Sequence, residues 1–73
     1  MKGKFSLTVS EIDSAVINTA GAYILVNSNN NAVYVGRSDV DLNKRLKEHL
    51  PENEKELCMR RSDITYFYFE NTS

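Results

Sequence analysis

A run of five polar residues splits the middle of the chain into two short β-prone segments. Residues 23–26 and 32–35 are apolar or aromatic, and residues 27–31 between them read Asn-Ser-Asn-Asn-Asn. Asparagine tolerates left-handed backbone conformations and forms turns with its own side chain. The pattern therefore predicts a β-hairpin, and turn formation explains the asparagines better than recognition of nucleic-acid bases does.

The register of this hairpin decides which side chains share a face, because side chains alternate along a strand. With a two-residue turn at 29–30, Tyr23 lies opposite Gly36 and Leu25 lies opposite Tyr34. These four residues then share one face, with the two tyrosines as diagonal neighbours. A four-residue loop keeps this arrangement, whereas a three-residue loop destroys it. The opposite face, which we expect to be the core layer, carries Ile24, Val26, Val33 and Val35.

The segments outside the hairpin supply a helix before it and a strand at the end of the chain. Residues 9–18 show apolar side chains at helical spacing, and Thr8 or Ser10 can cap the start of this helix. Residues 64–69 are aromatic and β-branched, which predicts a third strand covered on both faces. Residues 51–63 are polar and fit either a solvated turn or a short helix.

Residues 41–50 predict a second helix with a stripe of leucines along one side. Asp39 or Asp41 can cap its start, and a proline follows its end. Arg45 and His49 are four residues apart and flank the stripe, so both are expected to point toward the sheet. The stripe consists of Leu42, Leu46 and Leu50.

The length and charge of the chain limit what it can be. Seventy-three residues make one small domain, in which about 60% of the unfolded surface is buried on folding. A hydrophobic content of 41% excludes a disordered tail. Nine Lys and Arg against ten Asp and Glu give a net charge of −1, which argues against an indiscriminate polyanion binder. A local basic patch stays open.

The single cysteine and the short apolar runs indicate the cellular location of the protein. Cys58 has no partner for an internal disulfide, and it is expected to be a small buried side chain rather than a nucleophile. The longest apolar run, residues 22–26, is far below the ~20 residues that a membrane span needs. We therefore expect a soluble, cytoplasmic protein without a membrane partner.

Three short motifs stand in a fixed order around the hairpin. They are Gly21-Ala22-Tyr23, then Tyr34-Val35-Gly36, then Lys44-Arg45-Leu46 with His49 four residues after the arginine. In this strand–turn–strand–helix context, the chain resembles the GIY-YIG nuclease superfamily. The resemblance implies an α+β domain spanning residues 1–73, with a small three-stranded antiparallel sheet flanked by helices.

The same resemblance implies an endonuclease that hydrolyses DNA phosphodiester bonds with one divalent metal, Mg²⁺ or Mn²⁺. Tyr23 and Tyr34 are then candidates for the base that activates water, without a decision between them. Arg45 is the candidate for the scissile phosphate, because a guanidinium binds phosphate oxygens in a two-pronged geometry. His49 can transfer a proton or hold phosphate.

Plainer interpretations stand beside these roles. The two tyrosines fit half-buried strand positions, Arg45 can pair with Asp41 on the helix surface, and His49 suits a helix C-terminus. Arg37, Gly36 and Lys44 are the further candidates for phosphate binding. Arg37 fits a solvated loop arginine almost as well, and Gly36 allows close approach of backbone or ligand.

One departure from the family pattern concerns the metal. In the family, the metal-binding glutamate lies on a helix after the third strand, and this sequence stops before such a helix. Glu11, Glu48 and Glu70 are poor substitutes; by its spacing, Glu48 is expected on the side of its helix away from Arg45 and His49. We therefore expect no metal ligand in these residues, a domain shortened at its C-terminus, and a chain that is inactive alone.

Two other kinds of function stay open. The chain can be a non-catalytic nucleic-acid-binding module, or a protein-interaction module that keeps only the fold. The charges between Arg37 and His49 sum to only +1, which supports contact with a few phosphates and weak DNA binding. A sheet face without a covering helix further predicts self-association into a homo-oligomer.

Overall fold

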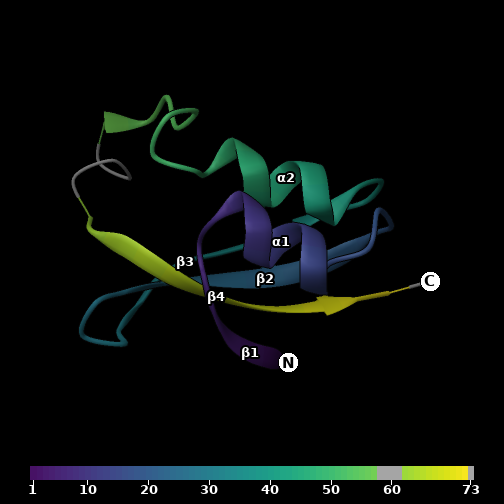
Figure 1. Cartoon of the computed structure of the whole chain (residues 1–73), viewed down its shortest axis with the longest axis horizontal. Helices are drawn as coiled ribbons and strands as arrows, with labels where there is room; N and C mark the ends of the chain where they lie inside the picture. Colours follow the sequence, from purple (N-terminus) through teal and green to yellow (C-terminus); the bar gives the residue numbers. More distant parts are fainter. Residues whose placement is uncertain (58–61, 73) are drawn as a thin grey trace.

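Two helices cover one face of an antiparallel sheet (Figure 1). The computed structural model of the chain describes residues 1–57 and 62–72, so Cys58 lies outside the described residues. In chain order the described elements are β1 (Lys2–Ser6), α1 (Val9–Ala15), β2 (Gly21–Asn27), β3 (Ala32–Ser38), α2 (Leu42–Glu48) and β4 (Ile64–Asn71). The strands lie side by side in the order β1-β4-β2-β3.

The α+β class is confirmed, but the expected number of strands is wrong. Within the described residues the sheet has four strands, because Lys2–Ser6 forms an edge strand antiparallel to β4. This segment has few apolar residues, and its pairing is non-local. Phe5 lies opposite Phe67, and its ring centroid is 5.5 Å from that of Phe67 and 5.6 Å from that of Phe69.

The predicted register of the hairpin is confirmed where it matters for the site. Tyr23 pairs with Gly36, and Leu25 pairs with Tyr34. The register shifts after Leu25, so that Val26 lies opposite Ala32. The shift is confined to the loop end of the hairpin and leaves Tyr23 and Tyr34 on one face.

The asparagines of the hairpin loop are used as turn formers. The Asn27 side-chain oxygen accepts hydrogen bonds from the backbone amides of Asn29 and Asn31, each at 3.0 Å. Asn30 adopts a left-handed conformation with φ of 63°. Turn chemistry therefore accounts for these residues, as expected.

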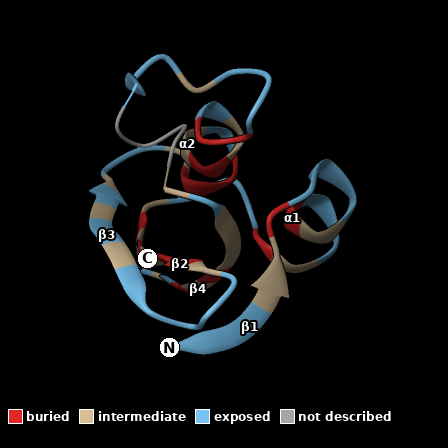
Figure 2. Ribbon diagram, turned by 90° about the vertical axis from the view of Figure 1, so that its left-hand side faces the viewer, coloured by how far each residue is buried: buried red, intermediate tan, exposed pale blue. Residues whose placement is uncertain are grey.

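The assignment of the core face was wrong. The helices cover the face that carries Tyr23 and Leu25, both fully buried, and the opposite face is the open one (Figure 2). The reason is β4, whose Phe69 and Phe67 lie opposite Tyr23 and Leu25 and extend the same aromatic face. On the opposite face, Val26 is buried, Ile24 and Val33 are half-buried, and Val35 is 66% exposed.

Both helices begin at predicted caps. The Thr8 hydroxyl accepts from the Glu11 amide at 3.2 Å, and the Asp41 carboxylate accepts from the Lys44 amide at 3.0 Å. The first helix ends at Ala15, three residues earlier than predicted. The leucine stripe of the second helix is confirmed, since Leu42, Leu46 and Leu50 are all buried.

Side chains of α2 fix that helix against the end of α1. The buried Asn43 amide donates to the Val16 carbonyl at 2.9 Å and to the Asp13 carboxylate at 3.3 Å. Lys47 forms an ion pair with Asp13 at 2.6 Å. The hydrogen bonds from Lys47 and Asn43 lower the pKa of Asp13. These contacts set the rotation of α2, and hence the direction in which its other face points.

The last strand is covered by helices on one side only, although the sequence predicted cover on both. Phe67 and Phe69 are buried, whereas Tyr66 and Tyr68 are half-buried on the helix-free face. There the Lys4 ammonium lies 4.1 Å from the centre of the Tyr66 ring. Among the described residues, no helix is long and apolar enough to cross a membrane.

Candidate active site

A buried phenol connects β2 to the end of α2. The Tyr23 hydroxyl lies 2.7 Å from Nε2 of His49, and the Tyr23 side chain has no exposed surface. Gly36, its partner across the hairpin, makes room for the phenol: a Cβ at this position would lie 2.6 Å from the Tyr23 hydroxyl oxygen. Gly36, which lies inside β3 rather than at its end, therefore serves the packing of Tyr23.

His49 is the C-cap of α2 and is held at both ring nitrogens. Nε2 contacts Tyr23, and Nδ1 lies 2.7 Å from Oε1 of Glu54. The His49 side chain is only 8% exposed. With both nitrogens engaged inside the protein, the imidazole is placed to hold or move a proton between side chains rather than to contact phosphate.

Glu54 is the residue that sequence reasoning missed. It lies in the polar segment that we expected to be solvated, yet its carboxylate is only 10% exposed. A turn brings it back under α2, with the Glu54 amide donating to the Leu50 carbonyl at 2.9 Å. A glutamate five residues after His49, beyond a proline, follows no helical or strand period, so the sequence contained no pattern that could identify it.

The Glu54 carboxylate is ionised. Burial raises its pKa, but hydrogen bonds from His49 and from the backbone amides of Glu56 and Lys55 outweigh burial and leave the pKa below its ordinary value. Oε2 accepts from the Lys55 amide at 3.1 Å and from the Glu56 amide at 3.4 Å. Oε1 is thereby left for His49.

Tyr34 is the exposed member of the tyrosine pair. Its ring centroid lies 6.1 Å from that of Tyr23 and 5.5 Å from that of His49. The prediction that the two tyrosines share one face, with His49 on that face, is confirmed. Tyr34 is 37% exposed and forms part of a pocket wall, whereas Tyr23 lies behind it.

Arg45 extends from α2 into the same pocket, where it meets Glu48. Its Nη1 lies 2.7 Å from Oε1 of Glu48, and the two side chains are 41% and 49% exposed. The expectation that Glu48 lies on the other side of the helix was wrong, because residues three apart on a helix are neighbours. The alternative partner of Arg45, Asp41, instead caps the helix and accepts from Asn18.

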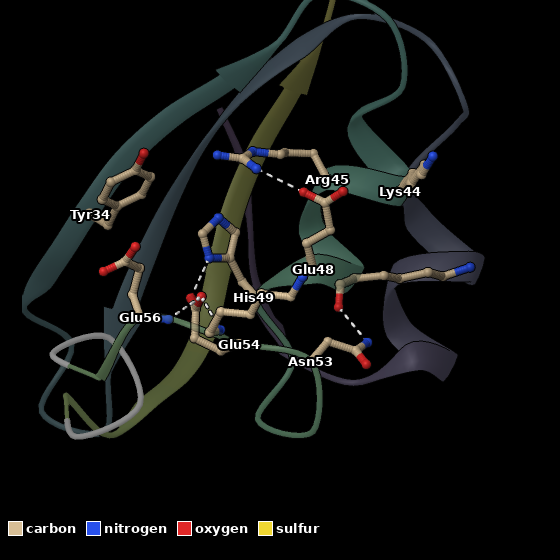
Figure 3. Close-up of a pocket in the computed structure, with 10 residues that line it drawn as sticks. Tyr34, Lys44, Arg45, Glu48, His49, Asn53, Glu54 and Glu56 are labelled. Atoms are coloured by element: carbon tan, nitrogen blue, oxygen red, sulfur yellow. Dashed lines mark hydrogen bonds and ion pairs between the residues drawn. The ribbon is translucent and has the colours of Figure 1, made fainter.

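The pocket has a volume of about 950 Å³ and opens between β3, α2 and the turn after α2 (Figure 3). Arg45 lies above His49, and Glu54 lies on the other side of the imidazole ring. Of the predicted site residues, Tyr34, Lys44, Arg45 and His49 line the pocket. Arg37 is not among the lining residues; its side chain is 77% exposed and pairs with Asp39 at 3.5 Å.

Charge and burial act on Tyr23 in opposite directions. Burial raises the pKa of Tyr23, while the positive charge of Arg45 lowers it and the neighbouring Tyr34 raises it further; the net shift is upward. The hydrogen bond to Glu48, and then the interaction with Tyr23, raise the pKa of Arg45 above its ordinary value. A neutral, buried phenol therefore lies beside a charged guanidinium that is partly exposed in the pocket.

The described residues contain no preformed cluster of metal-ligating side chains. In residues 1–57 and 62–72, no group of three or more His, Cys, Asp or Glu side chains could hold a metal ion. Glu48 is paired with Arg45, and Glu54 is committed to His49 and two backbone amides. Glu70 lies on β4 opposite Ala22, away from the pocket.

A family comparison assigns this arrangement to a known class. The family model of the GIY-YIG catalytic domain matches residues 19–72, which include the hairpin, α2 and β4. The chain therefore belongs to the GIY-YIG family, a family of nuclease domains that generally use a divalent metal. Neither the curated proteins nor the solved structures gave a match to this chain.

Proposed function

We propose that this chain is an endonuclease domain that acts on DNA and hydrolyses phosphodiester bonds with Mg²⁺ or Mn²⁺. Membership of the GIY-YIG family supports the reaction class. The observation that carries the proposal is the pocket. The Arg45 guanidinium and the exposed Tyr34 phenol line it, next to the hydrogen bonds that connect Tyr23, His49 and Glu54. A single domain over residues 1–73 and a cytoplasmic location remain part of this proposal.

Arg45 is the phosphate-binding group in this proposal. Its guanidinium can exchange the Glu48 carboxylate for two phosphate oxygens, and an exposed ion pair of this kind contributes only about 0–1 kcal/mol. The positive charge then stabilises the negative charge that grows on the phosphate in the transition state. Lys44 adds a cation at the pocket edge.

Tyr34 is the phenol that can meet the attacking water, because it is the tyrosine on the pocket wall. Tyr23 and His49 are buried behind it and act through their effect on Tyr34 and Arg45. Arg37 and Gly36 remain predicted phosphate contacts: Arg37 from outside the pocket, and Gly36 through its backbone.

We assign the metal ion to no described residue, since no group of three or more metal-ligating side chains is found among them. We therefore expect at most slow cleavage from these 73 residues alone. The same observation favours a second candidate function, a DNA-binding module of the family that does not cut.

Two assays on the wild-type chain separate these functions. Binding to a fluorescent DNA duplex is measured by anisotropy, and nicking of supercoiled plasmid is measured with and without Mg²⁺ or Mn²⁺. Metal-dependent nicking that is lost in Arg45→Ala supports the endonuclease. Salt-sensitive binding without any nicking supports the non-catalytic module, and absence of DNA binding overturns both.

A further inference from the structure

The Glu54 carboxylate is divided between two kinds of partner. Oε2 accepts hydrogen bonds from the backbone amides of Lys55 and Glu56, and Oε1 faces Nδ1 of His49 at 2.7 Å. The amide bonds fix the orientation of the carboxylate independently of the imidazole. The position of Oε1 is thus set by the turn after α2, before any contact with His49 is considered.

An ionised carboxylate can only accept hydrogen bonds, so Nδ1 of His49 must carry a hydrogen. In the neutral imidazole the other nitrogen, Nε2, then has a free lone pair, and the Tyr23 hydroxyl 2.7 Å away must donate to it. We propose that Glu54 is a positioning residue that holds His49 in the Nδ1–H tautomer and thereby makes Tyr23 the donor to Nε2. The tautomer itself does not depend on the proposed function; only its effect on DNA cleavage rests on that function.

The tautomer matters because the Tyr23 hydroxyl is buried and has few places to direct its hydrogen. In the opposite tautomer, Nε2 would donate to Tyr23, whose own hydrogen would have to turn away from His49. Arg45, the charged group that acts on Tyr23, offers only donors and cannot receive it. The Nδ1–H tautomer is thus the one in which all three groups are satisfied.

The Nδ1–H tautomer also gives different roles to His49, Tyr23, Tyr34 and Glu54. His49 is withdrawn from substrate, because Glu54 and Tyr23 occupy its two nitrogens. Tyr23 is a donor in the interior, and Tyr34 is left as the phenol that reaches the pocket. Glu54 therefore orders the site without contacting DNA.

The substitution Glu54→Gln tests the direction of the hydrogen bonds with almost no change of shape. The two backbone amides still require an acceptor, so the glutamine oxygen must take the place of Oε2. Its NH₂ group then faces His49 and donates to Nδ1, which forces the hydrogen onto Nε2. The variant should therefore invert the tautomer rather than merely weaken a contact.

The chain contains one histidine, so its imidazole nitrogens can be observed by ¹⁵N NMR without ambiguity. At alkaline pH, without DNA or metal, we expect Nδ1 to be the protonated nitrogen in the wild type and Nε2 in Glu54→Gln. Glu52→Gln, the same charge change at an exposed position outside the pocket, should leave the wild-type tautomer.

A wild-type chain with the hydrogen on Nε2 would overturn the proposal, as would the same tautomer in the wild type and in Glu54→Gln. The wild-type spectrum alone decides the first point, even if the variant fails to fold. Because the measurement uses neither DNA nor metal, its failure would leave the proposed nuclease function untouched, and a chain without DNA binding would leave the tautomer result intact.

Discussion

The Tyr23 hydroxyl lies 2.7 Å from Nε2 of His49, and the two residues are 26 positions apart in the chain. This contact joins the central strand β2 to the C-terminal end of α2. A second contact, between Glu54 and Nδ1 of His49, holds the other nitrogen of the ring. The buried hydrogen bonds of Tyr23, His49 and Glu54 therefore fix the interior of the site, and Tyr34 and Arg45 lie next to them in the pocket.

Removing the Tyr23 hydroxyl should destabilise the fold. Tyr23→Phe keeps the ring but leaves Nε2 of His49 without its partner in a buried site, so we expect a loss of about 1–3 kcal/mol in the free energy of unfolding. Tyr34→Phe, at an exposed position, is the matched control and should change stability by less than about 0.5 kcal/mol. Urea unfolding of both variants makes the comparison, and equal losses would contradict it.

A methyl group at Gly36 should displace both phenols. The Cβ of Gly36→Ala would lie 2.6 Å from the Tyr23 hydroxyl oxygen and 2.7 Å from Cε2 of Tyr34. We expect a loss of about 1–3 kcal/mol from overpacking. Val35→Ala, at the exposed neighbouring position, serves as the control in the same urea experiment. A Gly36→Ala chain as stable as the wild type would show that the tyrosines pack elsewhere.

The ionised Glu54 should make stability depend on acid pH. Its pKa is lowered in the folded chain, so it contributes stability above its ordinary pKa and loses that contribution as the pH falls through the folded value. Between about pH 5 and pH 3, the wild type should therefore lose more stability than Glu54→Gln. Thermal unfolding at several pH values measures the two slopes, and parallel slopes would refute the argument.

Glu48 should compete with DNA for Arg45. Glu48→Gln removes a carboxylate 2.7 Å from the guanidinium, so we expect DNA affinity to rise about two- to fivefold, within the range of an exposed ion pair. Glu52→Gln makes the same charge change outside the pocket and separates this effect from a general reduction of negative charge. An equal gain in both variants would point to net charge alone.

Self-association through the helix-free face of the sheet is testable at Val35. This side chain is 66% exposed beside Ile24, on the face that carries Tyr66 and Tyr68. A charge there should disfavour apolar contact between copies, so Val35→Lys should lower the apparent mass in sedimentation velocity. Val40→Lys, at a loop position 79% exposed, should not. A wild-type chain that is monomeric at high concentration would contradict the predicted self-association.

Local patterns predicted the parts of the fold that depend on local chemistry. The asparagine loop, the caps Thr8 and Asp41, and the leucine stripe follow from turn, capping and helical preferences, and all were found. The shared face of Tyr23 and Tyr34 follows from strand alternation, which the register shift near the loop does not disturb.

Features that depend on distant pairing could not be predicted in the same way. The edge strand β1 is polar and exists through its pairing with β4, whose paired residues lie at least 60 positions further along the chain. Phe67 and Phe69 of β4 determine which face of the hairpin is buried. Their register with β2 cannot be predicted from the sequence of the hairpin alone. Glu54 reaches His49 through an irregular turn, and such turns have no period to recognise.

Arg45 provides the most direct test of the proposed DNA site. The binding of a DNA duplex is measured across a salt series for the wild type, Arg45→Ala and Lys2→Ala, the last at an exposed position of the distant edge strand. The account predicts that Arg45→Ala weakens binding by about 1 kcal/mol, roughly fivefold, and reduces the salt slope by about one unit, while Lys2→Ala changes little. Equal losses in the two variants would contradict a specific phosphate site at Arg45.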